Sequence, residues 1–156
     1  MYETLETPKR AELYTYERRQ DGTKMAELVV FTCQHQASRV ARVFQTLDHL
    51  KGLKIRQVAL PCSGKLEVSF LLKALEKGGD GVALFGCPEG ECRYMVGSTR
   101  AKGRVSYAAR ILEEIGVGKD RVRRFVLESQ PSQDALEGLG AWVEKIKAME
   151  NIPRSS

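Results

Sequence analysis

The sequence predicts an α/β domain with a parallel sheet that is covered by helices on both faces. Short apolar segments alternate four times with longer amphipathic segments, and this alternation is typical of parallel sheets. Glycines follow three of the amphipathic segments, as they do at helix ends. At 156 residues the chain can form one domain with a sizeable core. We expect this domain at residues 25–150, between an N-terminal arm (1–24) and a short tail (151–156).

The first half of the domain predicts two strands, each followed by a helix. Residues 26–32 form a dense β-branched and apolar run, which indicates the first strand. Apolar residues then recur at helical spacing until Gly52, which ends the first helix. Residues 55–60 indicate the second strand, and the second helix ends at Gly78 and Gly79.

The third strand is predicted at residues 82–85, and a long helix follows it after a loop. Ser98 or Thr99 is predicted to cap this helix, because a side-chain oxygen there can accept a hydrogen bond from a helix N–H group. Gly116 is predicted to end it. The predicted buried stripe consists of Ala101, Val105, Ala108, Leu112 and Ile115.

The fourth strand, residues 122–127, contains Arg123 and Arg124. Burying two arginines on both faces of a sheet would be costly, so this strand is expected at an edge. Pro131 and Ser132 then precede the last helix. With right-handed crossovers, we expect the flavodoxin-like strand order 2-1-3-4.

The net charge of +5 is local. Residues 95–124 hold 8 Lys/Arg and 3 Asp/Glu. The rest of the chain holds 17 Lys/Arg and 17 Asp/Glu, so its charges balance. The excess indicates a solvated helix face, on which Arg100 and Arg104 lie together, or a docking face for an acidic partner or ligand. No recognised motif or aromatic platform accompanies it, so no nucleic-acid partner is expected.

The sequence gives no sign of a membrane span or of a secretory signal. No stretch approaches the roughly 18 apolar residues of a membrane span. The charged first 24 residues lack the hydrophobic region of a signal peptide. We therefore expect a cytoplasmic protein, whose arm becomes ordered only against other subunits.

The four cysteines all follow predicted strands. Cys33 comes directly after the first strand, Cys62 lies two residues after the second, and Cys87 lies just after the third. Because parallel strands end at the same edge of a sheet, the order 2-1-3-4 brings these three thiols together. Cys92 belongs to the same loop as Cys87 and adds a fourth. In the cytoplasm such cysteines are more often metal ligands or catalysts than disulfide partners.

The thiols alone leave several chemistries open. Four thiolates suit an iron–sulfur cluster or a structural zinc ion, because both favour soft ligands. Zinc sites more often use two close pairs of cysteines, and this chain has only one. Cys87 and Arg93 also form a Cys-x5-Arg pattern, as in thiol phosphatases and sulfurtransferases. Glu89 and Glu91 would place negative charge in such an anion site. A turn with incidental cysteines is the remaining alternative.

Across residues 27–147 the sequence resembles the delta subunit of methyl-viologen-reducing hydrogenase, an iron–sulfur electron-transfer subunit that joins a hydrogenase to heterodisulfide reductase. The resemblance lies in residues 62–64, 71–82, 86–87 and 112–116, and in Gly90, Cys92, Tyr94 and Gly97.

The resemblance implies a [2Fe–2S] cluster at Cys33, Cys62, Cys87 and Cys92, and no catalytic residue. It also implies a place in a multi-subunit oxidoreductase. Electrons would pass between a donor or acceptor subunit, such as a hydrogenase, a formate dehydrogenase or another reductase, and the flavin subunit of a heterodisulfide-reductase-like partner. The thiol enzyme and a zinc-stabilised interaction module are the alternatives.

The sequence departs from the family pattern at several positions. The family commonly begins with a Cys-x-x-Cys pair, but here Gln36 stands where the partner of Cys33 would be. Four thiols remain, which is enough for one cluster. Pro88 and Arg93 replace histidines of the family's central loop, and residues 96–98 replace its Glu-Gly-Asn. These changes concern the reduction potential and the docking partner more than the cofactor.

Overall fold

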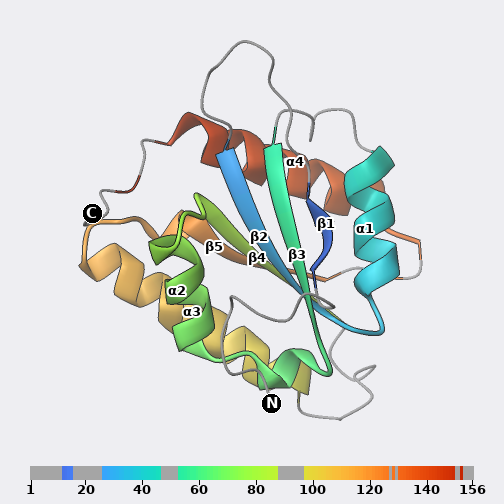
Figure 1. Cartoon of the computed structure of the whole chain (residues 1–156), viewed down its shortest axis with the longest axis horizontal. Coiled ribbons are helices and arrows are strands. Elements are labelled where there is room, and N and C mark those ends of the chain that lie inside the picture. Colours follow the sequence, from blue (N-terminus) through green and yellow to red (C-terminus); the bar gives the residue numbers. More distant parts are fainter. Residues whose placement is uncertain are drawn as a thin grey trace.

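The computed structural model describes residues 12–15, 26–46, 53–87, 97–126, 128, 130–149 and 152. Its centre is a sheet with four parallel strands (Figure 1). These strands are β2 (Ala26–Cys33), β3 (Leu53–Leu60), β4 (Gly81–Gly86) and β5 (Val122–Val126). They are paired in the order β3-β2-β4-β5, all parallel, which confirms the predicted order 2-1-3-4. β5 lies at the edge of the sheet, as its two arginines predicted.

A fifth strand extends the sheet beyond β3. β1 (Glu12–Thr15) pairs antiparallel with β3, where Glu12 lies opposite Val58. β1 belongs to the segment that was predicted as an arm. The expectation that the arm becomes ordered only against other subunits is therefore wrong for these four residues, which pair with the sheet of their own chain.

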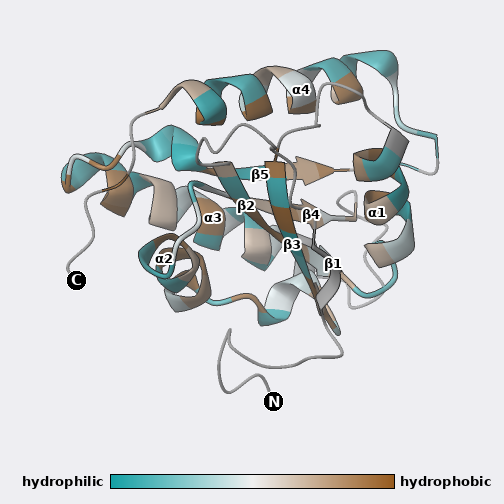
Figure 2. Cartoon of the chain, turned by 45° about the horizontal axis from the view of Figure 1, so that its top comes forward, coloured by the Kyte–Doolittle hydropathy of each residue, from teal (hydrophilic) through white to brown (hydrophobic). Residues whose placement is uncertain are grey.

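Four α-helices of the described residues cover both faces of the sheet (Figures 1 and 2). They are α1 (Ala37–Thr46), α2 (Val68–Glu76), α3 (Gly97–Glu114) and α4 (Gln133–Ala148). α2 and α3 pack on one face, and α1 and α4 pack on the other. None of the helices that the structure describes is both long and apolar enough to cross a membrane.

The two-sided cover explains the sequence of the central strands. In β2, Val29 and Phe31 point into the core under α2 and α3, whereas Leu28 and Val30 point into the core under α1 and α4. All four are almost completely buried, so the strand is a continuous apolar run instead of an alternating one. Each such side chain contributes about 1.5–3 kcal/mol by its burial.

Helix α3 begins and ends differently from the sequence prediction. It begins at Gly97, so Ser98 and Thr99 lie inside its first turn and neither occupies the predicted cap position. The buried stripe is confirmed from Ala101 to Leu112, but Ile115 is 64% exposed. The chain leaves the helical path at this point, because Gly116 has a φ of +82°. The helix therefore ends before Ile115 can reach the core.

Two glycines of this region allow a test of the local backbone. Gly103 lies inside α3 and Gly116 follows it, and a Cβ atom at either position would meet nothing within 4 Å. We expect Gly103→Ala to raise the free energy of unfolding by about 0.5–1 kcal/mol, because alanine favours the helix. Gly116→Ala should lower it by about 1–2 kcal/mol, because a side chain disfavours positive φ. Urea denaturation followed by circular dichroism measures both, and equal effects would contradict this account.

Candidate metal centre

The sheet register brings three cysteines to one edge. Cys33, the last residue of β2, lies opposite Leu60, the last residue of β3. Thr32 lies opposite Phe85 of β4, so Cys33 is level with the last residue of β4 and Cys87 follows directly. Cys62 comes two residues after Leu60. The chain passes from β2 to β3 on one side and then returns to β4 on the other side, so the thiols lie where the strand order reverses.

A tight turn holds Cys33 against the neighbouring strand. The Gln34 N–H donates to the Leu60 carbonyl at 2.6 Å, and the Gln36 N–H donates to the Cys33 carbonyl at 2.9 Å. Helix α1 starts at the next residue, Ala37, whose carbonyl accepts a hydrogen bond at 2.8 Å from the buried Gln57 side chain of β3. The Cys33 turn is thus fixed on both sides by β3.

The Cys62 loop is fixed by helix α3. Cys62 caps the short 3-10 helix η2 (Ser63–Lys65), and its sulfur accepts a hydrogen bond from the Gly64 N–H at 3.3 Å. Residue 64 must be glycine, because a Cβ atom there would lie 2.7 Å from the Gly97 Cα atom at the start of α3. The loop and the first turn of α3 are therefore in direct backbone contact.

Arg104 joins the same loop to α3, a contact that the sequence did not predict. Its Nη1 atom donates to the carbonyls of Gly64 and Leu66, each at 2.6 Å. The prediction that Arg104 and Arg100 share an outer face is therefore wrong for Arg104, which is partly buried against the loop. Arg100 is exposed, as expected.

The third thiol, Cys87, is partly exposed and lies beside the turn that carries Cys33. The Nε2 atom of Gln36 donates to the Cys87 sulfur at 3.4 Å. The Oε1 atom of Gln36 accepts a hydrogen bond from Arg39 at 2.7 Å. Sequence reasoning missed this contact, since Gln36 was noticed only as the residue that replaces a cysteine of the family pattern.

The other two thiols act electrostatically on Cys33. Burial raises the pKa of the Cys33 thiol above its ordinary value, and a hydrogen bond from the His35 backbone partly offsets this rise. Repulsion from Cys87 and Cys62, and a hydrogen bond with Cys87, raise the pKa further. Neighbouring thiolates are unfavourable without a cation, and a coordinated metal would supply the positive charge that keeps them deprotonated.

The described residues do not include the whole predicted ligand set. Cys92 lies outside them, as does Arg93 of the alternative Cys-x5-Arg pattern. Within the described ranges, no three His, Cys, Asp or Glu side chains are arranged to hold a metal ion. The His35 side chain is exposed. The chemistry of the donors nevertheless fits a soft metal centre, because the Cys33 thiol interacts with the Cys62 and Cys87 thiols at one edge of the sheet.

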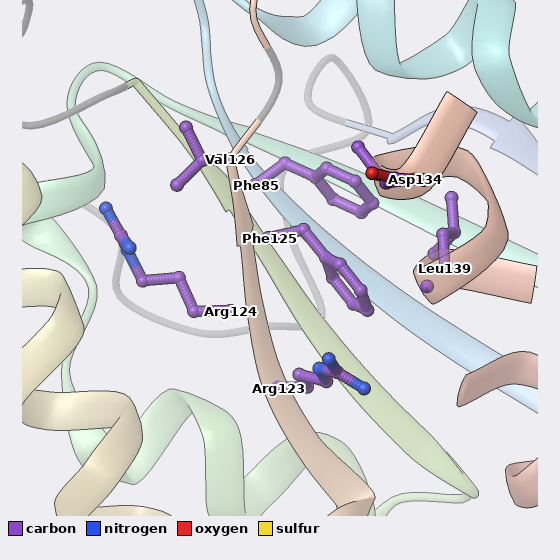
Figure 3. Close-up of a pocket in the computed structure, with 9 residues that line it drawn as sticks. Phe85, Arg123, Arg124, Phe125, Val126, Asp134 and Leu139 are labelled. Atoms are coloured by element: carbon purple, nitrogen blue, oxygen red, sulfur yellow. The ribbon is translucent and has the colours of Figure 1, made fainter. Parts of the chain in front are cut away.

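A separate pocket lies between β5 and α4 (Figure 3). It has a volume of about 230 Å³, and none of its lining residues is a cysteine. Phe85 and Phe125 stack with ring centroids 5.2 Å apart, and the Arg123 guanidinium lies 5.2 Å from the Phe125 ring. Asp134 lines the pocket from α4. The pocket is thus distinct from the thiol site, although Phe85 is only two residues from Cys87.

A comparison with protein families shows where the chain belongs. The family described as methyl-viologen-reducing hydrogenase, delta subunit, matches residues 28–150. The chain belongs to this family. The match covers β2 to α4 and all four cysteines, so every part of the site lies within it.

Several curated relatives have names that mention hydrogenases or heterodisulfide reductases. The iron-sulfur subunit of the vhu F420-non-reducing hydrogenase of Methanocaldococcus jannaschii is 33% identical over 122 residues, which are 76% of this chain and 91% of the relative. The iron-sulfur subunit of the vhc F420-non-reducing hydrogenase of Methanococcus voltae is 36% identical over 95 residues, which are 61% and 66% of the two chains. One subunit of the ferredoxin:CoB-CoM heterodisulfide reductase of Methanosarcina mazei is 39% identical over 98 residues, which are 63% of this chain but only 12% of that protein.

Arg104 allows a test of how the Cys62 loop is held. We expect Arg104→Met to lower the free energy of unfolding by about 1.5–3 kcal/mol, because hydrogen bonds from a charged group to two loop carbonyls are lost. Arg100→Met is the matched control, one turn away and exposed, and should change stability by less than about 0.5 kcal/mol. Urea denaturation of both variants measures the difference. Equal stability of the two variants would show that the hydrogen bonds from Arg104 to the Cys62 loop contribute little to the free energy of unfolding.

Proposed function

We propose that this chain is an iron–sulfur electron-transfer subunit of a multi-subunit oxidoreductase. Cys33, Cys62, Cys87 and Cys92 together hold one [2Fe–2S] cluster. The observation that carries this proposal is the meeting of thiols from three separate strand ends at one edge, where the Cys33 thiol interacts with both Cys62 and Cys87. Cys92 completes the set from the loop that follows Cys87.

The surroundings of the thiols support a cluster. Cys33 and Cys62 are buried, so solvent reaches at most part of the centre. Backbone N–H groups donate to sulfur at Cys62 and at Cys33, and such hydrogen bonds stabilise thiolate ligands and tune the potential of iron–sulfur centres. A cluster bound here supplies one-electron chemistry, while the protein orients the ligands and limits the access of water.

The family and the names of relatives support the partners that we propose. Some relatives are named as subunits of hydrogenases, and another is named as a subunit of a heterodisulfide reductase. We place this chain between two redox subunits in the cytoplasm. One is a hydrogenase, a formate dehydrogenase or another reductase, and the other is the flavin subunit of a heterodisulfide-reductase-like partner. The similarity to a short part of a heterodisulfide reductase subunit supports this, because a stretch of similar sequence is already joined to such a subunit there.

The exposed surface offers two places for partner contact. Cys87 is the least buried of the three described thiols, so electrons leave or enter most directly there. Helix α3 carries exposed basic residues, among them Arg100, Lys102 and Arg110, and Arg110 lies over the ring of the exposed Tyr107. We propose that this face docks an acidic surface of a partner protein.

Substitutions in the central loop test the cluster against a thiol enzyme. We expect Cys87→Ser and Cys92→Ser each to lose most of the iron, because each removes a metal–sulfur bond. Arg93→Lys should keep the cluster, because arginine supplies at most charge nearby. Iron content and the visible absorption of protein purified without oxygen measure this.

A thiol enzyme would behave differently in the same variants. It would turn over a phosphoryl or sulfur-donor substrate and would lose that activity in Arg93→Lys, while Cys92→Ser would matter little. Turnover that depends on both Cys87 and Arg93, in protein without iron, would overturn the proposed function.

A further inference from the structure

Gln36 is a buried polar side chain beside the thiol site. It is only 8% exposed and lies in the turn between Cys33 and α1. A buried amide is costly unless both of its ends are hydrogen-bonded. Here both ends are, because Oε1 accepts from Arg39 at 2.7 Å and Nε2 donates to the Cys87 sulfur at 3.4 Å.

The contact with Arg39 determines which end of the amide faces the sulfur. An arginine side chain has donors and no acceptor. The Gln36 oxygen must therefore point to Arg39, and the amide nitrogen must point to Cys87. A thiolate ligand of a metal centre accepts hydrogen bonds and donates none. The arrangement is thus compatible with Cys87 as a metal ligand.

This hydrogen bond crosses between two strand ends. Gln36 is held by the turn after β2, since its own N–H donates to the Cys33 carbonyl at 2.9 Å, whereas Cys87 follows β4. The sulfurs of Cys62 and Cys33 accept from backbone N–H groups, which every substitution except proline leaves in place. At Cys87 one donor is the Gln36 side chain, so its contribution depends on the residue at position 36.

We propose that Gln36 raises the reduction potential of the cluster by donating its amide N–H to the Cys87 sulfur. This inference rests on the proposed function, in which Cys87 is a ligand. Reduction adds one electron, taken from the donor protein of the complex, and no bond of this chain forms or breaks. The added negative charge is shared by the sulfur ligands, so a hydrogen bond to sulfur stabilises the reduced state more than the oxidised state.

Two substitutions at position 36 and one matched control test this role. Gln36→Leu removes the donor, and we expect the potential to fall by about 59 mV, which corresponds to tenfold in the one-electron equilibrium constant. Gln36→Glu replaces the donor with an oxygen that faces sulfur and should lower the potential further. Gln34→Glu makes the same chemical change two residues away on an exposed side chain, and should shift the potential by less than half as much as Gln36→Glu. Redox titration monitored by electron paramagnetic resonance measures all three.

A second measurement starts from the wild-type protein. Wild-type protein labelled with ¹⁵N in the glutamine side chains should show a weakly coupled ¹⁵N nucleus in the pulsed resonance spectrum of the reduced cluster. Gln34→Glu should keep this coupling, which rules out Gln34 as its source, and Gln36→Leu protein that retains a cluster should lose it, which assigns the coupling to Gln36.

The outcomes separate this inference from the proposed function. Three results would each overturn the role of Gln36 without affecting the proposed function. They are a wild-type potential in Gln36→Leu, equal shifts of the potential in Gln36→Glu and Gln34→Glu, and no ¹⁵N coupling in wild-type protein that contains a cluster. Wild-type protein without any iron–sulfur signal would overturn both.

Discussion

Three parallel strands, β3, β2 and β4, end at one edge of the sheet, and the candidate site depends on that alignment. Cys33, Cys62 and Cys87 are 29 and 25 positions apart in the sequence, yet each follows one of these strands. An antiparallel strand in the middle of the sheet would send one thiol to the opposite edge. The buried apolar side chains on both faces of the sheet fix this register, because a shift of one residue would turn every side chain to the other face.

Bringing the thiols together has an electrostatic cost that the surrounding loops only partly offset. Burial and neighbouring sulfurs raise the pKa of Cys33, and backbone N–H groups stabilise Cys33 and Cys62. The loops themselves are held by contacts from outside the site. Arg104 of α3 binds the carbonyls of the Cys62 loop, and β3 fixes the Cys33 turn. A bound metal centre would supply the positive charge that these contacts do not.

The sequence was sufficient to predict the four parallel strands, their order and the edge at which the cysteines follow them. Apolar runs indicate the strands, and glycines indicate where the helices between them end. It could not predict contacts that depend on how distant elements meet. Arg104 has the same sequence signal as exposed Arg100, and only the closeness of α3 to Gly64 distinguishes them. Gln36 differs from Gln34 only by its burial and its contact with Cys87. The β1 strand was missed because its four residues show no clear periodicity.

The central claim is that thiols from separate strand ends bind one two-iron cluster. Iron K-edge X-ray absorption of protein purified without oxygen tests it most directly, together with metal analysis. The account predicts about two irons per chain, with sulfur as the nearest ligands and a single iron neighbour for each iron. Stoichiometric zinc without iron, or a spectrum with several iron neighbours as in a four-iron cluster, would contradict it.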